Sequence, residues 1–398
     1  MNELAGLLSS GIIQEEDTAF IVVDFGALDE RLGALKSAFP DATRHAVAIK
    51  TQPLRPVLKW LIEQGCGLEA ASLEEVQMAL ECGAQPQQLV FDSPVKTRSE
   101  IQWCAQHAPG MVVNANSLSE LERLPGSENL RWGLRVNPMV STAQEAVFDV
   151  SNAQSKFGVA ITRHDEIKDA FRKFPLEGLH VHVGSGADAV KRHADAVMRV
   201  LDLAHDIHEE RQRQGRRGLT FMDVGGGLAS AVSPNQMRAF ADRIEPRWHA
   251  DWEVWTEFGQ WVHAPTGSAY SRIEYVEAPR DGQPGKAYVH LGADYFTRQV
   301  YQHRRPLDVV VYDRDGLGVD RDARPFEIVG PLCFAGDILT DGMPLPHPEQ
   351  GDWVRFGHTG ANTYGLWSRH CSRSLPKVIG RAIDGQFEVL QARKKWTF

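Results

Sequence analysis

The sequence predicts an α/β fold: a (β/α)8 TIM barrel with a C-terminal β-sandwich or β-barrel domain. Eight short apolar segments alternate with helical patterns between residues 46 and 256. Eight such repeats favour a closed barrel over an open, doubly wound sheet, which is the competing interpretation. After residue 268, strand-like segments follow one another without helices, which indicates a β-domain. We therefore expect an N-terminal strand that joins the β-domain (1–26), the barrel (27–267) and the β-domain (268–398).

The predicted elements follow one another in a regular order. A first strand is expected at residues 19–25 and a helix from Gly26 to Phe39. A Ser or Thr followed three residues later by Glu is a capping signal, and it recurs at Ser72, Thr97 and Ser117. The barrel strands are expected at residues 46–49, 67–70, 89–92, 111–114, 132–136, 178–183, 219–224 and 252–256. The β-domain strands are expected at residues 270–276, 286–291, 308–312, 326–329 and 352–356.

Composition limits the classes of function. A length of 398 residues with 42% hydrophobic and 24% charged residues is ordinary for a globular enzyme. The net charge of -9 argues against a nucleic-acid partner, and the absence of an apolar run near 18 residues argues against a membrane span. The five cysteines lack metal or redox spacing, and the N-terminus lacks a signal-peptide pattern. We expect a cytoplasmic enzyme with reduced thiols and no metal site.

Ionisable residues gather where the predicted barrel strands end. Lys50 follows the apolar strand 46–49, at the rim where barrel enzymes place their chemistry. A partly desolvated lysine there suits a nucleophile that forms a Schiff base, although a solvated strand-end lysine is an open alternative. The other ionisable residues at this rim are Glu69, Asp92, Arg135, His180, His182, Asp223 and Glu257. Their number favours an active site over a purely structural role.

The glycines that follow the last two barrel strands suggest a phosphate site. Gly225, Gly226 and Gly227 leave backbone N–H groups uncovered, and Gly259 follows the eighth strand. A Gly-Gly-Gly turn alone is more often just a tight turn. Together with a Schiff-base lysine it points to pyridoxal 5′-phosphate, with Glu257 pairing with the pyridine nitrogen. His182 either stacks on the cofactor ring or is a hydrogen-bonded core histidine.

A series of motifs resembles the fold-type III pyridoxal-phosphate-dependent decarboxylases, the group that holds diaminopimelate, ornithine, lysine and arginine decarboxylases. The motifs run in the family's order over nearly the whole chain, and as a set they are highly specific. They are Ala46–Lys50, Gly67–Ser72, Val90–Thr97, Leu134–Asn137, Ser155–Gly158, Gly178–Ser185, Asp223–Gly227, Glu257–Gly259, Gly330–Cys333 and Gly336–Asp337.

The resemblance implies a homodimer whose active sites are shared between subunits. Lys50 would be the cofactor lysine and His182 the residue that stacks on the ring. Cys333 would reach the neighbouring subunit's site and protonate the product carbanion. The other residues that the resemblance places at the cofactor are Glu69, Arg135, Ser185, Gly226, Gly227, Glu257, Gly259 and Tyr364.

Departures from the family pattern concern the substrate. Phe334 stands where the family has an acid that grips the substrate's distal amine, and Gln260 replaces an arginine. Asn362 replaces the family tyrosine, a role that either Asn362 or Tyr364 would then fill. Arg298, Arg304 and Arg305 crowd the segment near the expected substrate end. A carboxylate-bearing substrate suits this set better than a plain diamine.

We therefore expect a decarboxylase that acts through an external aldimine and a quinonoid on an amino acid or amino-acid conjugate. A citrate-conjugated intermediate of siderophore biosynthesis is one such substrate, with Arg298, Arg305 and Phe334 at its far end. The alternatives are a decarboxylase of free diaminopimelate, ornithine or lysine, an amino-acid racemase, and an inactive regulatory homologue.

Overall fold

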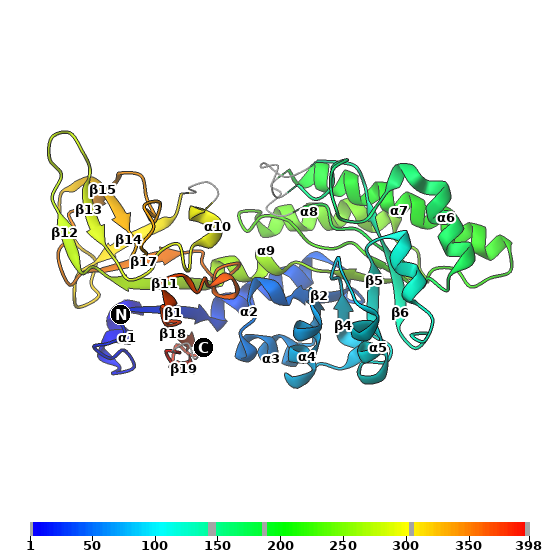
Figure 1. Ribbon diagram of the computed structural model, residues 1–398, viewed down its shortest axis with the longest axis horizontal. Coiled ribbons are helices and arrows are strands. Elements are labelled where there is room, and N and C mark those ends of the chain that lie inside the picture. The colour runs from blue at the N-terminus through cyan, green and yellow to red at the C-terminus, as the bar shows by residue number, and fades with distance from the viewer. Residues whose placement is uncertain (1–2, 142–148, 185–188, 302–305, 395–398) are drawn as a thin grey trace. The chain divides into compact units, whose positions relative to one another are not determined.

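The computed structural model describes residues 3–141, 149–184, 189–301 and 306–394. By its internal contacts the chain divides into two compact units, one formed by residues 31–262 and the other by residues 1–30 together with 263–398 (Figure 1). Strand β1 (Ala19–Asp24) therefore belongs to the same unit as the C-terminal part of the sequence.

The first unit, residues 31–262, contains the expected barrel. Eight parallel strands pair in the order β5-β4-β3-β2-β10-β9-β8-β6, and pairing between β5 and β6 closes the ring. Apolar side chains such as Val90, Phe221 and Trp255 fill its interior. The strands are β2 (Arg44–Ala48), β3 (Gly67–Ala70), β4 (Leu89–Phe91), β5 (Val112–Ala115), β6 (Arg131–Asn137), β8 (Gly178–His180), β9 (Phe221–Asp223) and β10 (Glu253–Thr256), and β7 (Val159–Ala160) extends β6.

Helices separate the barrel strands, as the alternating pattern predicts. They are α2 (Phe25–Ala38), α3 (Arg55–Glu63), α4 (Leu73–Glu81), α5 (Arg98–His107), α6 (His164–Lys173), α7 (Val190–Arg213), α8 (Pro234–Ile244) and α9 (Gly259–His263). Ser72 caps α4, and Thr97 forms a full capping box at α5. The third capping prediction is wrong. Ser117 accepts no capping hydrogen bond, and Leu118–Arg123 forms a 3-10 helix. Ser117 Oγ lies 3.0 Å from Ser119 Oγ, and the Glu120 carboxylate accepts from the Asn116 N–H while it pairs with the buried ammonium of Lys96.

The second unit is a sheet domain. A six-stranded sheet has the order β14-β17-β11-β1-β18-β19, and a four-stranded sheet has the order β12-β13-β15-β16. The single strand predicted at 270–276 is two strands in different sheets, because the chain bends at the fully buried Ile273. The elements are α1 (Glu3–Ser9), β11 (Gly267–Arg272), β12 (Tyr275–Glu277), β13 (Gly285–Tyr288), α10 (Thr297–Val300), β14 (Asp308–Tyr312), β15 (Ala323–Val329), β16 (Met343–Pro346), β17 (Trp353–Gly357), β18 (Lys377–Arg381) and β19 (Phe387–Gln391).

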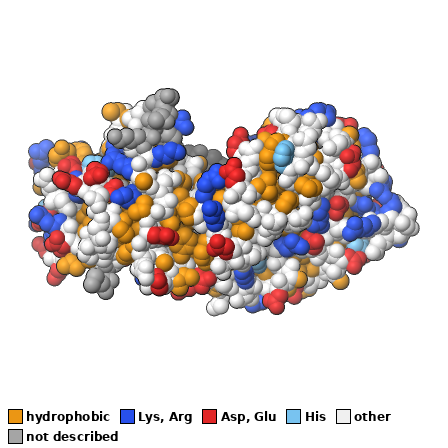
Figure 2. Space-filling model, turned by 90° about the horizontal axis from the view of Figure 1, so that it is seen from below, with side chains coloured by type: hydrophobic (Ala, Val, Ile, Leu, Met, Phe, Trp, Pro, Cys, Tyr) orange, Lys and Arg blue, Asp and Glu red, His pale blue; other side chains and the backbone are white. Residues whose placement is uncertain are grey.

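The surface carries mixed charges. On the face drawn in Figure 2, acidic, basic and hydrophobic side chains are interspersed. Among the helices of the described residues, none is both long enough and apolar enough to cross a bilayer.

Candidate active site

A cavity of about 240 Å³ lies at the carboxyl ends of the barrel strands. Ionisable side chains from strands far apart in the sequence face it, because the carboxyl ends of parallel strands meet at one rim. It is lined by Lys50, Glu69, Ala71, Asp92, Pro94, Arg135, Val150, Phe157, His182 and Glu257. Five residues that the sequence placed at the cofactor are therefore brought together here: Lys50, Glu69, Arg135, His182 and Glu257.

Lys50 sits in a 3-10 turn, Ile49–Thr51, that directly follows β2. Its Nζ forms an ion pair with Glu69 Oε2 on the adjacent strand β3. The Glu69 side chain is 1% exposed, whereas that of Lys50 is 45% exposed toward the cavity. Burial raises the pKa of Glu69 to about 8 even though the Lys50 charge lowers it. Burial alone would lower the pKa of Lys50, but Glu69 and Glu257 outweigh it and hold that pKa above its usual value.

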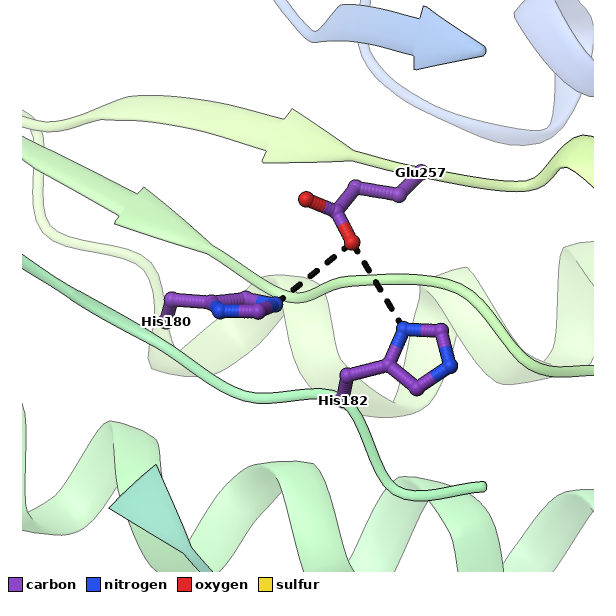
Figure 3. Close-up of side chains that lie close together, drawn as sticks. All are labelled: His180, His182 and Glu257. Carbon is purple, nitrogen blue, oxygen red and sulfur yellow. Dashed lines mark ion pairs between the residues drawn. The ribbon is translucent and has the colours of Figure 1, made fainter. Parts of the chain in front are cut away.

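Glu257, at the end of β10, is approached by two histidines (Figure 3). His180 Nε2 and His182 Nδ1 each lie 3.5 Å from Glu257 Oε2. Burial alone would raise the pKa of Glu257, but the two rings and a hydrogen bond from Asp92 hold it well below its usual range. Burial lowers the pKa of His182 to about 4. Glu257 is therefore the ionised carboxylate of the cavity, beside neutral imidazoles.

Two further carboxyl groups surround Glu257. Burial and the Glu257 charge raise the pKa values of Asp92 and Asp223 well above the usual range. Asn114 Nδ2 donates to Asp92 Oδ1 at 2.8 Å, and the Gly225 N–H donates to Asp223 Oδ1 at 2.9 Å. The sequence placed Asp92 and Asp223 at strand ends but gave them no role in the site.

Phe157 is a site residue that the sequence analysis did not assign. Its ring lies 4.5 Å from the Arg135 guanidinium, and both residues line the cavity. A cation held against an aromatic face keeps its orientation without a carboxylate partner. The motif Ser155–Gly158 contains Phe157, and it is the sequence feature that could have identified this residue as part of the site.

The glycine turn after β9 can accept no side chain. Gly225 has φ +66° and Gly227 has φ +104°, which L residues rarely adopt. A Cβ on Gly226 would lie 2.4 Å from the Glu257 carbonyl oxygen. The Gly226 N–H has only a long contact to His182 Nδ1, at 3.4 Å. Gly259 packs as tightly, since its Cβ would lie 2.6 Å from Thr51 Oγ1.

The other predicted site residues are not in this cavity. Ser185, Arg304 and Arg305 lie outside the described residues. Cys333, Phe334, Tyr364 and Arg298 belong to the sheet unit. There Cys333 is exposed, Phe334 stacks on Tyr301 with ring centroids 5.1 Å apart, and the Tyr364 hydroxyl donates to Gln391 Oε1 at 2.6 Å.

The residues present fit pyridoxal phosphate. Glu257 Oε1 is buried and has no hydrogen-bond partner among the described residues, so it can accept a hydrogen bond from a ring N–H. The pKa of Glu257 is held well below its usual range, and an ionised carboxylate favours a protonated ring nitrogen. In the turn Gly225–Gly227 the Gly226 N–H has only a long contact among the described residues, so it can donate to a phosphate oxygen. His180, His182 and Glu257 are also residue types that bind metals. However, His180 Nε2 lies between Asp92 Oδ2 at 3.3 Å and Glu257 Oε2 at 3.5 Å, a position that suits a proton donor.

Known proteins match the whole chain. The pyridoxal binding domain of the pyridoxal-dependent decarboxylases matches residues 25–264, and the C-terminal sheet domain of these proteins matches residues 266–360. A diaminopimelate decarboxylase from Deinococcus radiodurans is 28% identical over 372 residues, covering 92% of this chain and 90% of that protein. A diaminopimelate decarboxylase from Methanothermobacter thermautotrophicus is 25% identical over 426 residues, covering 100% and 95%.

Solved structures share the fold. Diaminopimelate decarboxylase from Helicobacter pylori, complexed with L-lysine, has a TM-score of 0.85 at 22% identity, covering 97% of this chain and 96% of that one. The arginine decarboxylase of Paramecium bursaria Chlorella virus, bound to agmatine, has a TM-score of 0.81 at 18% identity, covering 95% and 98%.

Proposed function

Because the chain belongs to the pyridoxal-dependent decarboxylase family, we propose that it removes the α-carboxylate of a free diamino acid of the diaminopimelate type. The enzyme is a carboxy-lyase that uses pyridoxal 5′-phosphate. The observation that carries the proposal is the cavity itself, where the Lys50 amine, Glu69 and the unpartnered Glu257 Oε1 lie in a chain that matches both family domains. Two diaminopimelate decarboxylases that align over nearly the whole chain support this substrate class.

The bound cofactor supplies an electron-withdrawing ring that accepts the electron pair left on Cα when carbon dioxide departs. Lys50 must lose a proton before its Nζ can attack an aldehyde. The ion pair with Glu69 Oε2 on the adjacent strand would hold the Lys50 amine in position at the cavity. Glu257 stays ionised and would accept a hydrogen bond at Oε1, while burial and the Glu257 charge raise the pKa values of Asp92 and Asp223 beside it. His182 stays neutral beside the cofactor ring.

The phosphate group is assigned to the glycine turn. Gly226 and Gly227 offer backbone N–H groups beside Gly259, and Ser185 is the remaining expected donor. Arg135 lines the cavity together with Phe157, and its guanidinium lies 4.5 Å from the Phe157 ring. Arg135 would be a further contact of the cofactor.

One observation favours a second substrate class. Phe334 stands where the family pattern has an acid, and it stacks on Tyr301 instead of presenting a carboxylate to a distal amine. A substrate whose far end is acidic, or conjugated to a group such as citrate, would suit this site better, with Arg298, Arg305 or Tyr364 near it. Siderophore precursors have this chemistry.

A carbon dioxide assay separates the two substrate classes. The purified holoenzyme would be supplied with diaminopimelate, ornithine and lysine, and in parallel with the same diamino acids conjugated to citrate. Turnover of a free diamino acid at an ordinary enzyme rate, on the order of 10 s⁻¹, supports the main proposal. Turnover of the conjugates alone replaces it with the second. Amino-acid racemisation without carbon dioxide would reject both.

We also propose that the enzyme is a homodimer with shared sites, in which Cys333 of one protomer protonates the product carbanion in the other. Its support is that Cys333 is exposed and belongs to the unit that does not contain the cavity. Mixing the inactive Lys50→Ala protein with the impaired Cys333→Ala protein tests this. Subunit exchange would create intact sites that give roughly a quarter of wild-type activity, since half of the dimers would hold one intact site. A mixture that gains no activity over its two components after proven exchange would contradict shared sites.

A further inference from the structure

His193 is a buried histidine that lies directly against the glycine turn. It is in the first turn of α7, and its side chain is 0% exposed. Its Cε1 lies 3.4 Å from the position that a Cβ on Gly227 would occupy. On another side the ring packs edge-on against Phe240, with centroids 5.4 Å apart. The ring is therefore fixed behind the turn to which the cofactor phosphate is assigned.

Neither ring nitrogen of His193 has a partner at hydrogen-bond distance and angle among the described residues, and a hydrogen bond to the Gly226 backbone is the smallest of the influences on its pKa. A buried polar ring in this state is uncommon, because each unpaired group forgoes its hydrogen bond to water. An apolar residue of similar size would fill the same space against Phe240 without this cost. Burial lowers the pKa of His193 to about 3, repulsion from His182 adds to the decrease, and only the Gly226 backbone opposes it. The ring therefore has no anionic partner in the protein itself.

We propose that His193 is a positioning residue for the cofactor phosphate, which supplies a hydrogen-bond donor and positive charge from behind the turn Gly225–Gly227. The proposal rests on the assignment of the phosphate to that turn. A phosphate dianion on the turn provides the anion that the ring lacks, and a dianion favours the protonated ring at this short range. The Gly226 N–H has only a 3.4 Å contact to His182 Nδ1 among the described residues, and it would donate a hydrogen bond to the same anion.

Cofactor binding with and without the phosphate group tests the proposal. Full-length protein freed of cofactor would be titrated with pyridoxal 5′-phosphate and, separately, with pyridoxal, and imine absorbance would give each Kd. We expect His193→Phe to raise the Kd for pyridoxal phosphate at least tenfold and to change the Kd for pyridoxal less than twofold. His193→Gln keeps a neutral donor, so its loss should be about threefold and again confined to the phosphorylated ligand.

The matched control is His208→Phe, a buried histidine on the same helix whose Nδ1 accepts from Leu219 N at 3.1 Å and from Trp252 Nε1 at 3.0 Å. It should leave the ratio of the two Kd values at the wild-type level. Equal losses for both ligands in the His193 variants, or no loss for either, would overturn the proposal. If His193→Phe does not fold, His193→Gln decides alone. Wild-type protein that forms no imine with either ligand would instead reject the cofactor site.

Discussion

Removal of the buried ammonium of Lys96 should destabilise the barrel strongly. Its Nζ lies 2.6 Å from the Ser93 carbonyl oxygen, 2.9 Å from the Asn114 carbonyl oxygen and 2.7 Å from Glu120 Oε1. The side chains of Lys96 and Glu120 are 0% and 7% exposed, so water screens little of this pair. Lys96→Met leaves the Glu120 carboxylate buried without its cation, which costs about 3–5 kcal/mol.

The expected change in melting temperature follows from this free energy. For a domain of this size 1 kcal/mol corresponds to about 2–4 °C, so a loss of about 3–5 kcal/mol in Lys96→Met should lower the Tm by about 6–20 °C. The double variant Lys96→Met/Glu120→Leu removes both charges and should recover about 2 kcal/mol of the loss. Differential scanning calorimetry of the holoenzyme measures both values.

A Tm decrease below 3 °C in Lys96→Met would refute the reasoning, as would a double variant no more stable than the single one. The effect should also reach the active site. Asn114, whose carbonyl binds Lys96, holds Asp92 through its side-chain amide. We therefore expect faster cofactor loss from Lys96→Met during dialysis.

Three other predictions use the same kinds of measurement. Lys50→Ala should abolish the imine absorbance of the cofactor, whereas Cys333→Ala should keep it but slow turnover or alter the product; an unchanged rate in the second variant would remove Cys333 from the mechanism. Gly227→Ala should lower the Tm and weaken cofactor retention, because its Cβ would lie 1.8 Å from a backbone carbonyl oxygen and the residue has φ +104°. The control Gly215→Ala has φ +69° with open space around it, so it should lower the free energy of unfolding by only about 1–2 kcal/mol. Burial lowers the pKa of His263 to about 3, below its unfolded value of about 6.5, so its share of the stability is present at pH 7 and is lost as pH falls from 6.5 toward 3. Urea unfolding would measure the decrease in the free energy of unfolding between pH 7 and pH 5. This decrease should be smaller in His263→Phe than in the wild type, and equal decreases would contradict the assignment.

The barrel could be predicted because its signals are local. The strand expected at 67–70 is β3, and the strand end at Lys50 is an end of β2, since apolar runs and turn residues lie next to each other in the sequence. The sheet unit was harder. The strand expected at 270–276 divides at Ile273 because neighbouring chain segments, not its own residues, decide which sheet each half joins. β18 and β19 were missed for the same reason.

Capping at Ser117 shows why a local signal can fail. The residue types there match those at Thr97, where the capping box forms. At Ser117 a 3-10 helix follows, and Glu120 accepts from the Asn116 N–H while it pairs with Lys96. The spacing of a Ser or Thr and a Glu therefore does not by itself fix the type of helix that follows.

The sequence by itself determined which residues meet at the rim of the barrel, because parallel strands deliver whatever follows them to one edge. The order of the strands therefore predicted that Lys50, Glu69 and Glu257 lie close together. These three residue types in turn indicated the cofactor chemistry. Only the tertiary structure decided how these carboxyl groups differ, since burial and mutual repulsion raise the pKa of Asp92 while its neighbours hold the pKa of Glu257 well below the usual range. It alone placed His193 behind the glycine turn, because a contact between the start of one helix and the end of a distant strand leaves no pattern in the chain.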